Sequence, residues 1–285
     1  MINTVYSIQM EGSQPYARLI TYIQDDSAEI PIQDRPLVLI CPGGAYAFTS
    51  DREAEALALQ FLAMGYHAAV LRYSVVPAVF PTALSELAYS VKIIRRNARE
   101  WHVNPEKIIV LGCSAGGHLA ASLGVFWKED FLAEILGLGA SEHRLIRPDG
   151  MILCYPVITT GEAADGESIR NLLGGRKEEL WEKMSLENQV DGDTPPVFIW
   201  HTFTDNDVPV ENSLLFVSAL RRAGVCTEFH MYSCGGHGLS LANRLTQGQW
   251  DNSVQEECTS WIPLAHTWME HWYIKKGQSG DCSGF

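Results

Sequence analysis

The sequence lacks any long apolar run and any excess of positive charge. None of its hydrophobic stretches is long enough to span a bilayer, so we do not expect a membrane protein. Acidic residues outnumber basic ones by 34 to 21, which gives a formal net charge of −13. That charge argues against nucleic acids and anionic membrane surfaces as partners. The first residues also lack a basic stretch followed by an apolar one, so we expect no secretory signal and a cytoplasmic location.

Paired cysteines are missing as well. The seven cysteines are odd in number and include no Cys-x-x-Cys spacing. Cys41 and Cys154 fall inside apolar runs, where a free cysteine behaves as a small hydrophobic residue. The pattern therefore predicts reduced, buried cysteines and argues against a disulfide framework or a zinc site. We expect no metal ion and no organic cofactor.

The sequence does contain a regular alternation of short apolar runs with amphipathic ones. Its 285 residues, 46% of them hydrophobic, can bury a large core. The apolar runs are hydrophobic on both faces, as buried parallel strands are. They are Leu37–Cys41, His67–Leu71, Ile108–Leu111, Met151–Tyr155, Val197–Trp200 and Glu228–Tyr232. This alternation predicts one α/β domain over residues 1–285, with a doubly wound, mostly parallel sheet flanked by helices.

The segments between these runs favour helices. Ser50–Glu53 predicts a capping box that opens a helix ending near Gly65. Pro81 is expected to open a second helix with one apolar stripe, and a third is expected from about 210 to 223. The stretch 159–193 is polar and rich in Gly and Glu, so we expect it to be a cap-like insertion over the sheet edge.

One serine stands between glycines at a predicted strand-to-helix turn. The motif Gly112-Cys113-Ser114-Ala115-Gly116 follows the apolar run 107–111 and precedes a helix-forming run at 118–123. Small neighbours are needed there, because a serine on so sharp a turn has a strained backbone conformation. The arrangement is typical of the nucleophile elbow of an α/β-hydrolase, so we expect Ser114 to be a nucleophile.

A serine nucleophile requires a base, and the base requires an acid that orients it. In this fold the expected chain order is serine, then Asp or Glu, then histidine. His237 lies in a glycine-flanked loop after the last predicted strand and is the expected base. Asp205 and Asp207 both follow the strand Val197–Trp200. We favour Asp205 as the acid, because Asp207 is suited to cap the helix that begins near Pro209.

Other histidines have simpler explanations. His118 is expected to pack within the helix after the serine, and His230 is expected to be a hydrogen-bonded histidine of a strand. His201 begins the loop that carries the acid. None of the three occupies the position after the last strand that the base requires.

Hydrolysis at a carbonyl group also requires two backbone N–H groups that stabilise the developing oxyanion. One is expected from Ala115, at the amino end of the helix after the serine. The other is expected from Gly44 or Ala45, because a glycine-containing loop after Leu37–Cys41 lets the backbone approach the substrate. Four aromatic residues near the carboxyl ends of predicted strands are candidates for an acyl pocket or a sugar-stacking platform: Tyr46, Tyr155, Trp200 and Phe203.

Five segments resemble the small bacterial esterases of the α/β-hydrolase superfamily, and among these the BD-FAE-like, acetyl-xylan-esterase-like branch akin to hormone-sensitive lipase. They are Pro42–Tyr46, Ser50–Glu53, Leu71–Ser74, Gly112–Ala120 and Asp205–Pro209. Pro42 and Ala45 depart from the related His-Gly-Gly-Gly motif, which has histidine and glycine at these positions.

The resemblance assigns the same residues to the same roles. It implies Ser114 as nucleophile, Asp205 as acid and His237 as base. It also implies oxyanion donors at Gly44 or Ala45 together with Ala115.

The resemblance further implies a carboxylesterase for short acyl chains that removes acetyl groups from carbohydrate, such as imported xylo-oligosaccharides. The expected partner is thus a small acyl ester. Two alternatives stay open. The same three residues could hydrolyse an amide, as in an arylformamidase or a small peptidase, or the fold could serve a non-catalytic ligand receptor. The sequence also leaves open whether the chain forms a homo-oligomer.

Overall fold

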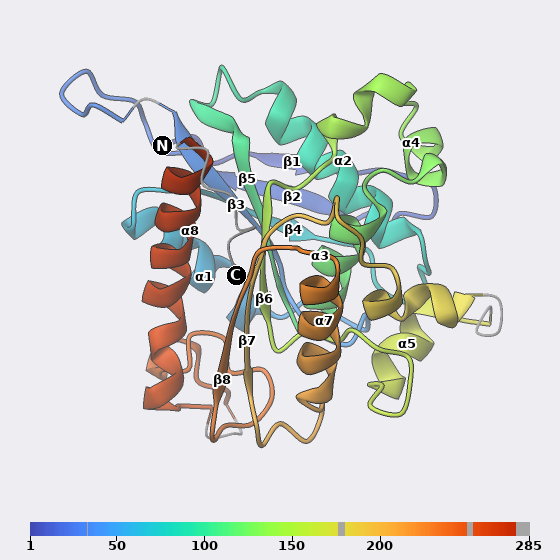
Figure 1. Cartoon of the computed structure of the whole chain (residues 1–285). Coiled ribbons are helices and arrows are strands. Elements are labelled where there is room, and N and C mark those ends of the chain that lie inside the picture. Colours follow the sequence, from blue (N-terminus) through green and yellow to red (C-terminus); the bar gives the residue numbers. More distant parts are fainter. Residues whose placement is uncertain (33, 176–179, 250–252, 278–285) are drawn as a thin grey trace.

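The computed structural model describes the chain except for residues 33, 176–179, 250–252 and 278–285. In this part of the chain eight strands form one sheet, with helices on both faces (Figure 1). The strands are β1 (Val5–Ser7), β2 (Arg18–Tyr22), β3 (Arg35–Cys41), β4 (His67–Arg72), β5 (Val103–Cys113), β6 (Gly150–Cys154), β7 (Val197–Thr202) and β8 (Thr227–Tyr232). The α-helices are α1 (Glu55–Ala63), α2 (Thr82–Arg96), α3 (Ala115–Phe126), α4 (Asp130–Ile135), α5 (Gly166–Leu173), α7 (Glu211–Arg222) and α8 (Trp261–Gly277). Short 3-10 helices are η1 (Asp51–Glu53), η2 (Ala140–Leu145), η3 (Glu182–Met184), η4 (Leu186–Asn188), η5 (Arg244–Thr246) and η6 (Glu256–Ser260).

The strand order is β1-β2-β4-β3-β5-β6-β7-β8, and β3 to β8 pair in parallel. All six predicted strands are present, which confirms the α/β fold. Two further strands, β1 and β2, were not predicted and add an antiparallel edge next to β4. These two strands are short and partly exposed, so no continuous apolar run announces them.

The two faces of the sheet are covered by different helices. Helices α2, α3 and α7 pack on one face, and α1 and α8 pack on the other (Figure 1). Side chains of β3 alternate accordingly: Leu37 and Leu39 contact the first layer, whereas Val38 and Ile40 contact the second. Because both faces are buried, the strand must be apolar throughout, as the sequence indicated.

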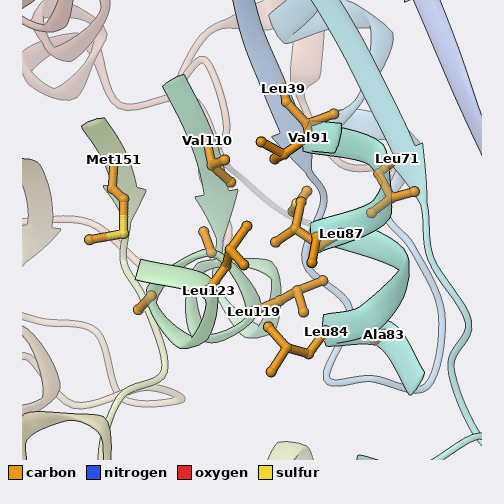
Figure 2. Packing of buried hydrophobic residues seen from close by; sticks show 14 of the residues in the cluster. Leu39, Leu71, Ala83, Leu84, Leu87, Val91, Val110, Leu119, Leu123 and Met151 are labelled. Atoms are coloured by element: carbon orange, nitrogen blue, oxygen red, sulfur yellow. The ribbon is translucent and has the colours of Figure 1, made fainter. Parts of the chain in front are cut away.

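Helix α3 is held close to the sheet by small residues. All of its residues are buried, and a Cβ on Gly124 would lie 2.3 Å from the Met151 sulfur. Leu119 and Leu123 of α3 lie against Leu84 and Leu87 of α2 (Figure 2). Burial of one such leucine stabilises the fold by about 1.5–3 kcal/mol. The packed leucines therefore hold in place the helix that begins directly after Ser114.

The predicted helix boundary at Ser50 is wrong. Ser50 makes no capping hydrogen bond, η1 occupies 51–53, and α1 begins only at Glu55. The Glu53 carboxylate, predicted to cap the helix, instead accepts a hydrogen bond from the Gly43 backbone N–H at 2.8 Å. The Glu53 side chain therefore bonds a backbone group in the core and not the N-cap residue of its own helix.

The segment 159–193 connects β6 and β7, which are neighbours inside the sheet order. Its described residues include α5, η3 and η4, and η4 contacts α3 and α7. Through η4 the segment packs against helices that cover one face of the sheet.

Most described cysteines follow the expectation. Cys41, Cys113, Cys154 and Cys258 are free and buried, whereas Cys234 is exposed. None of the helices in the described ranges combines the length and the apolarity needed to cross a bilayer.

Candidate active site

Ser114 lies on the sharp turn between β5 and α3. Its backbone has φ 54° and ψ −121°, a conformation that L-residues rarely adopt. A Cβ on Gly112 would lie 2.1 Å from the Gly116 carbonyl oxygen, and a Cβ on Gly116 would lie 2.1 Å from the Cys41 carbonyl oxygen. Both flanking positions therefore require glycine, for the reason that the sequence motif indicated.

The structure brings Ser114, His237 and Asp205 into one hydrogen-bonded line. His237 Nε2 lies 2.7 Å from Ser114 Oγ, and His237 Nδ1 lies 2.7 Å from Asp205 Oδ2. The carboxylate accepts the Nδ1 hydrogen, which leaves Nε2 free to accept the hydrogen of the serine hydroxyl. The three side chains come from the turn after β5 and from the loops after β7 and β8.

Asp205 is the carboxylate that contacts the histidine, as favoured from the sequence. It is 4% exposed, and its Oδ1 accepts hydrogen bonds from the backbone N–H groups of Asp207 and Val208. Asp207 is exposed, and it does not cap α7, whose N-cap is Val210 without a capping side chain. Burial alone would raise the pKa of Asp205, but hydrogen bonds from His201 and His237 outweigh it and hold that pKa below its usual value.

His201 is a residue of this site that the sequence analysis did not recognise. It is buried at the end of β7, and its Nε2 lies 3.3 Å from Asp205 Oδ2 and 3.0 Å from the Val208 carbonyl oxygen. Because both neighbours are acceptors, Nε2 carries the hydrogen. Its Nδ1 lies 2.8 Å from Ser213 Oγ of α7. Thus Asp205 contacts two histidines. The one sequence signal that could have pointed to His201 is that a polar residue ends an apolar strand.

His237 is poised to accept a proton. Burial lowers the pKa of this histidine, but the hydrogen bond and charge of Asp205, with the charges of Glu53 and Asp207, raise it above the usual 6.5. The edge of the Tyr155 ring also contacts the imidazole, with the ring centroids 5.2 Å apart at 74°. The imidazole is therefore fixed in position on several sides.

The loop after β3 lies opposite Ser114 and has an unusual backbone. Gly44, Ala45 and Tyr46 have φ values of 129°, 52° and 55°. Successive residues in such conformations turn backbone N–H groups toward one side, which suits an anion. Gly44 and Ala45 line the same cavity as Ser114 and His237, whereas Ala115 begins α3 directly behind the serine.

This cavity has a volume of about 580 Å³; most of its lining residues are polar, but its apolar surface is as large as its polar surface. The residues that line it are Gly44, Ala45, Phe48, Ser50, Arg52, Glu53, Ser114, Asp165, Glu167, Asn206, Asp207, Val208, His237 and Gly238. Four of them are carboxylic acids and one is an arginine. In the described part of the chain, no three His, Cys, Asp or Glu residues are grouped so as to hold a metal ion.

Three of the four aromatic residues expected near the substrate are buried, and the fourth, Phe203, is exposed but does not line the cavity. Tyr46, Tyr155 and Trp200 are 3%, 1% and 0% exposed and belong to the core. Tyr46 in particular does not line the cavity, and its hydroxyl bonds to His118 Nδ1 at 3.1 Å. The aromatic side chain in the cavity is Phe48, which is 60% exposed and which no sequence signal distinguished.

The segment 159–193 contributes to the cavity. Asp165 and Glu167, at the start of α5, line its rim, and Asn171 Nδ2 donates a hydrogen bond to the Ala45 carbonyl oxygen at 2.8 Å. The segment thus supports the loop after β3 and supplies acidic side chains at the entrance.

Two curated relatives share the region with the serine motif. The chain is 37% identical over 233 residues to endo-1,4-beta-xylanase B of Butyrivibrio fibrisolvens, covering 79% of this chain and 35% of that protein. It is 27% identical over 228 residues to the acetylxylan esterase of Xylanibacter ruminicola, covering 78% of this chain and 44% of that protein. The chain therefore spans less than half the length of either relative.

Two solved structures match along most of their length. The acetyl ester-xyloside bifunctional hydrolase from Caldicellulosiruptor lactoaceticus aligns with a TM-score of 0.78 and 35% identity, over 90% of this chain and 89% of that one. The carboxylesterase Cest-2923 from Lactobacillus plantarum WCFS1 aligns with a TM-score of 0.80 and 28% identity, over 96% and 98%.

Fold, site and relatives together define a class, the carboxylic ester hydrolases with an α/β-hydrolase fold. Residues 27–220, more than half of the chain, match the model of one family in this class. The chain belongs to the BD-FAE family, which confirms the resemblance seen in its motifs.

Two carboxylates in one loop allow a matched comparison. We expect Asp205→Asn to lower kcat for p-nitrophenyl acetate by about 10²- to 10⁴-fold, because the amide no longer orients and stabilises the imidazolium. We expect Asp207→Asn, the same chemical change on the exposed neighbour, to alter kcat less than about threefold. Steady-state kinetics on both folded variants checks this. Equal losses in the two variants would contradict the assignment of the acid.

The pH dependence follows from the raised pKa of His237. The imidazole must be neutral to accept the serine proton, and its pKa lies above 6.5. As the pH falls through that value the imidazole becomes protonated, so kcat/KM should decline on an acid limb whose midpoint lies above 6.5. A pH profile with p-nitrophenyl acetate measures it. A profile that stays flat down to pH 5.5 is the contrary result.

Proposed function

We propose that this chain is a serine carboxylesterase that hydrolyses short acyl esters, with acetylated carbohydrate such as xylo-oligosaccharides as its substrate class. The observation that carries the proposal is the hydrogen-bonded line from Ser114 through His237 to Asp205, at the wall of a cavity. A strained serine backed by a buried His–carboxylate pair has the arrangement that nucleophilic acyl transfer needs.

The first half of the reaction forms an acyl-enzyme. His237 Nε2 takes the proton of Ser114 Oγ as the oxygen attacks the ester carbonyl carbon. The carbonyl oxygen becomes an oxyanion, which accepts hydrogen bonds from the N–H groups of Ala115 and of Gly44 or Ala45. Collapse of this intermediate breaks the bond to the alcohol oxygen, and the imidazolium protonates the departing alcohol.

The second half releases the acid. Water enters the cavity, loses a proton to His237 Nε2 and attacks the acyl carbon. The second tetrahedral intermediate then collapses, the Ser114 oxygen leaves, and His237 returns its proton to that oxygen. Asp205 stays ionised throughout and stabilises each imidazolium. The net reaction converts one ester and one water into one acid and one alcohol, with no net gain or loss of protons by the protein.

The cavity lining favours small acyl groups and polar alcohols. Phe48 and Val208 are its larger apolar side chains, and they supply apolar surface that a short acyl group can contact. Asp165, Glu167 and Asp207 offer acceptors for the hydroxyl groups of a sugar. Proteins similar to this chain also include an acetylxylan esterase and an acetyl ester-xyloside bifunctional hydrolase.

Removal of the proposed nucleophile tests the reaction class. We expect Ser114→Ala to reduce hydrolysis of p-nitrophenyl acetate by about 10⁴-fold or more while the protein stays folded. A fluorophosphonate probe should form one adduct on Ser114 in the unmodified chain and none in the variant, as read by mass spectrometry. Full activity in the folded variant would refute the proposed nucleophile. A catalytically silent chain that forms no adduct would instead favour a ligand receptor.

The substrate class requires a panel. We expect acetate release from acetylated xylo-oligosaccharides with a kcat/KM at least tenfold above that for p-nitrophenyl butyrate. Formanilide and small peptides serve as amide substrates in the same panel, with acid release quantified by NMR. Faster turnover of an amide would replace the esterase proposal with an amidase. A preference for longer acyl chains would contradict acetylated carbohydrate as the substrate class.

A further inference from the structure

A second buried carboxylate, Glu53, lies at the wall of the active-site cavity. Glu53 is 4% exposed, and each of its two carboxylate oxygens has a separate partner. Oε2 accepts a hydrogen bond from the Gly43 backbone N–H at 2.8 Å, and Oε1 accepts one from the Tyr155 hydroxyl at 2.6 Å. A buried carboxylate is costly unless such bonds satisfy it, so its presence in the core calls for an explanation.

The first of these bonds holds the loop that faces Ser114. Gly43 precedes Gly44 and Ala45, the proposed oxyanion donors. A Cβ on Gly43 would lie 2.7 Å from Glu53 Oε2 and 2.9 Å from Ser114 Cβ. The loop backbone therefore lies in close contact with both the carboxylate and the serine. The Tyr73 hydroxyl also donates to the Pro42 carbonyl oxygen at 2.6 Å.

The second bond reaches the loop that carries the histidine. The Tyr155 hydroxyl donates to Glu53 and accepts the backbone N–H of Ser240 at 2.9 Å, three residues after His237. Ser240 has a positive φ of 54°, and its Oγ donates to the Arg52 carbonyl oxygen at 2.7 Å. Residues 52 and 53 therefore bind the loop of the proposed base through two independent routes.

We propose that Glu53 is a positioning residue that couples the two catalytic loops, setting the oxyanion donors through Gly43 and the base through Tyr155 and Ser240. The inference rests on the proposed function, since it concerns the same reaction. The spacing of nucleophile, base and oxyanion donors sets the rate, and a misplacement of about 1 Å can cost about 10²-fold. One side chain that contacts both loops fixes their separation.

The charge of Glu53 adds a signature that a merely structural residue would lack. The groups that face His237 are Asp205, Asp207, Glu53, the Tyr155 ring and Ser114, and all three carboxylates favour the imidazolium. Without the Glu53 charge, the pKa of His237 should fall. The acid limb of the pH profile should then move to lower pH.

Glu53→Gln separates the charge from the shape of the side chain. The amide oxygen can still accept from Gly43, but its NH₂ meets a Tyr155 oxygen that already accepts from Ser240. We expect kcat for p-nitrophenyl acetate to fall about ten- to a hundredfold, with KM changed less than about threefold. The acid limb should shift to lower pH. Glu55→Gln is the matched control: it removes a carboxylate two residues on that bonds Tyr22, and its kinetics should stay unchanged.

Glu53→Asp and Tyr155→Phe keep the proposal testable if the first variant does not fold. Glu53→Asp retains the charge but is one methylene shorter, so kcat should fall while the acid limb stays in place. Tyr155→Phe retains the ring against His237 but removes the hydroxyl that bonds both Glu53 and Ser240, so kcat should again fall at least tenfold. Both variants are compared with the unmodified chain by thermal unfolding and circular dichroism.

The readouts distinguish failure of this inference from failure of the proposed function. If the unmodified chain forms no Ser114 adduct with a fluorophosphonate, the proposed function fails. If the unmodified chain reacts, and a folded Glu53→Gln or Tyr155→Phe variant reacts and turns over within twofold of it, the positioning role fails alone. A parallel loss in kcat and in the rate of adduct formation supports it.

Discussion

The turn after β5 lies directly against the end of β3. A side chain on Gly116 would reach the Cys41 carbonyl oxygen at 2.1 Å, so two backbone segments meet there without any intervening atoms. This approach brings the loop that follows Cys41 beside Ser114, where its N–H groups can face a bound carbonyl group. The leucines packed between α2 and α3 hold α3 against the sheet and so maintain the close contact between the two backbone segments. Substrate geometry is thereby set by backbone contacts deep in the core.

Two buried carboxylates then organise the polar groups around this crossing. Asp205 contacts two histidines and two backbone N–H groups, and Glu53 contacts a backbone N–H and a tyrosine hydroxyl. Isolated buried charges would destabilise the fold by several kcal/mol each, but fully bonded ones restrict the conformations of the loops that carry their partners. The same bonds that make these charges tolerable therefore hold the residues of the proposed reaction in register. The hydrogen bonds of Asp205 and Glu53 thus contribute both to the stability of the fold and to the geometry of the proposed active site.

Local chemistry explains which features the sequence could predict. The parallel strands could be predicted because strands buried on both faces must be apolar throughout. The turn at Ser114 could be predicted because steric exclusion leaves glycine as the only residue for the positions that flank it. Asp205 and His237 followed from chain order once the serine was placed. The short edge strands β1 and β2 were not readable, because half-exposed strands carry no distinctive run.

Long-range partners explain the errors. Glu53 looked like a helix cap because a capping box is defined by residues three apart, yet its partners Gly43 and Tyr155 are 10 and 102 residues away. His201 is an exception, since its partner Asp205 is only four residues away; the contact depends on the fold of the loop after β7, which no sequence pattern specifies. Tyr46 is predicted to contact substrate because it lies near the carboxyl end of a predicted strand, but its ring is buried in the core, where its hydroxyl bonds His118, 72 residues away. No periodicity in the sequence encodes such contacts.

The two sides of the cavity come from parts of the chain with different constraints. The catalytic side is built from strand ends and is held by core contacts, so its geometry tolerates little change. The entrance is built from exposed residues such as Asp207 and from α5, where Asp165 and Glu167 are free of such packing. Loops and short helices over a rigid sheet can vary in sequence without loss of the fold. The acyl chemistry should therefore be common to proteins with this core, whereas the alcohol they accept should vary with the segment between β6 and β7. Because Asn171 of that segment also bonds Ala45, its variation would be transmitted to the loop facing the serine as well as to the entrance.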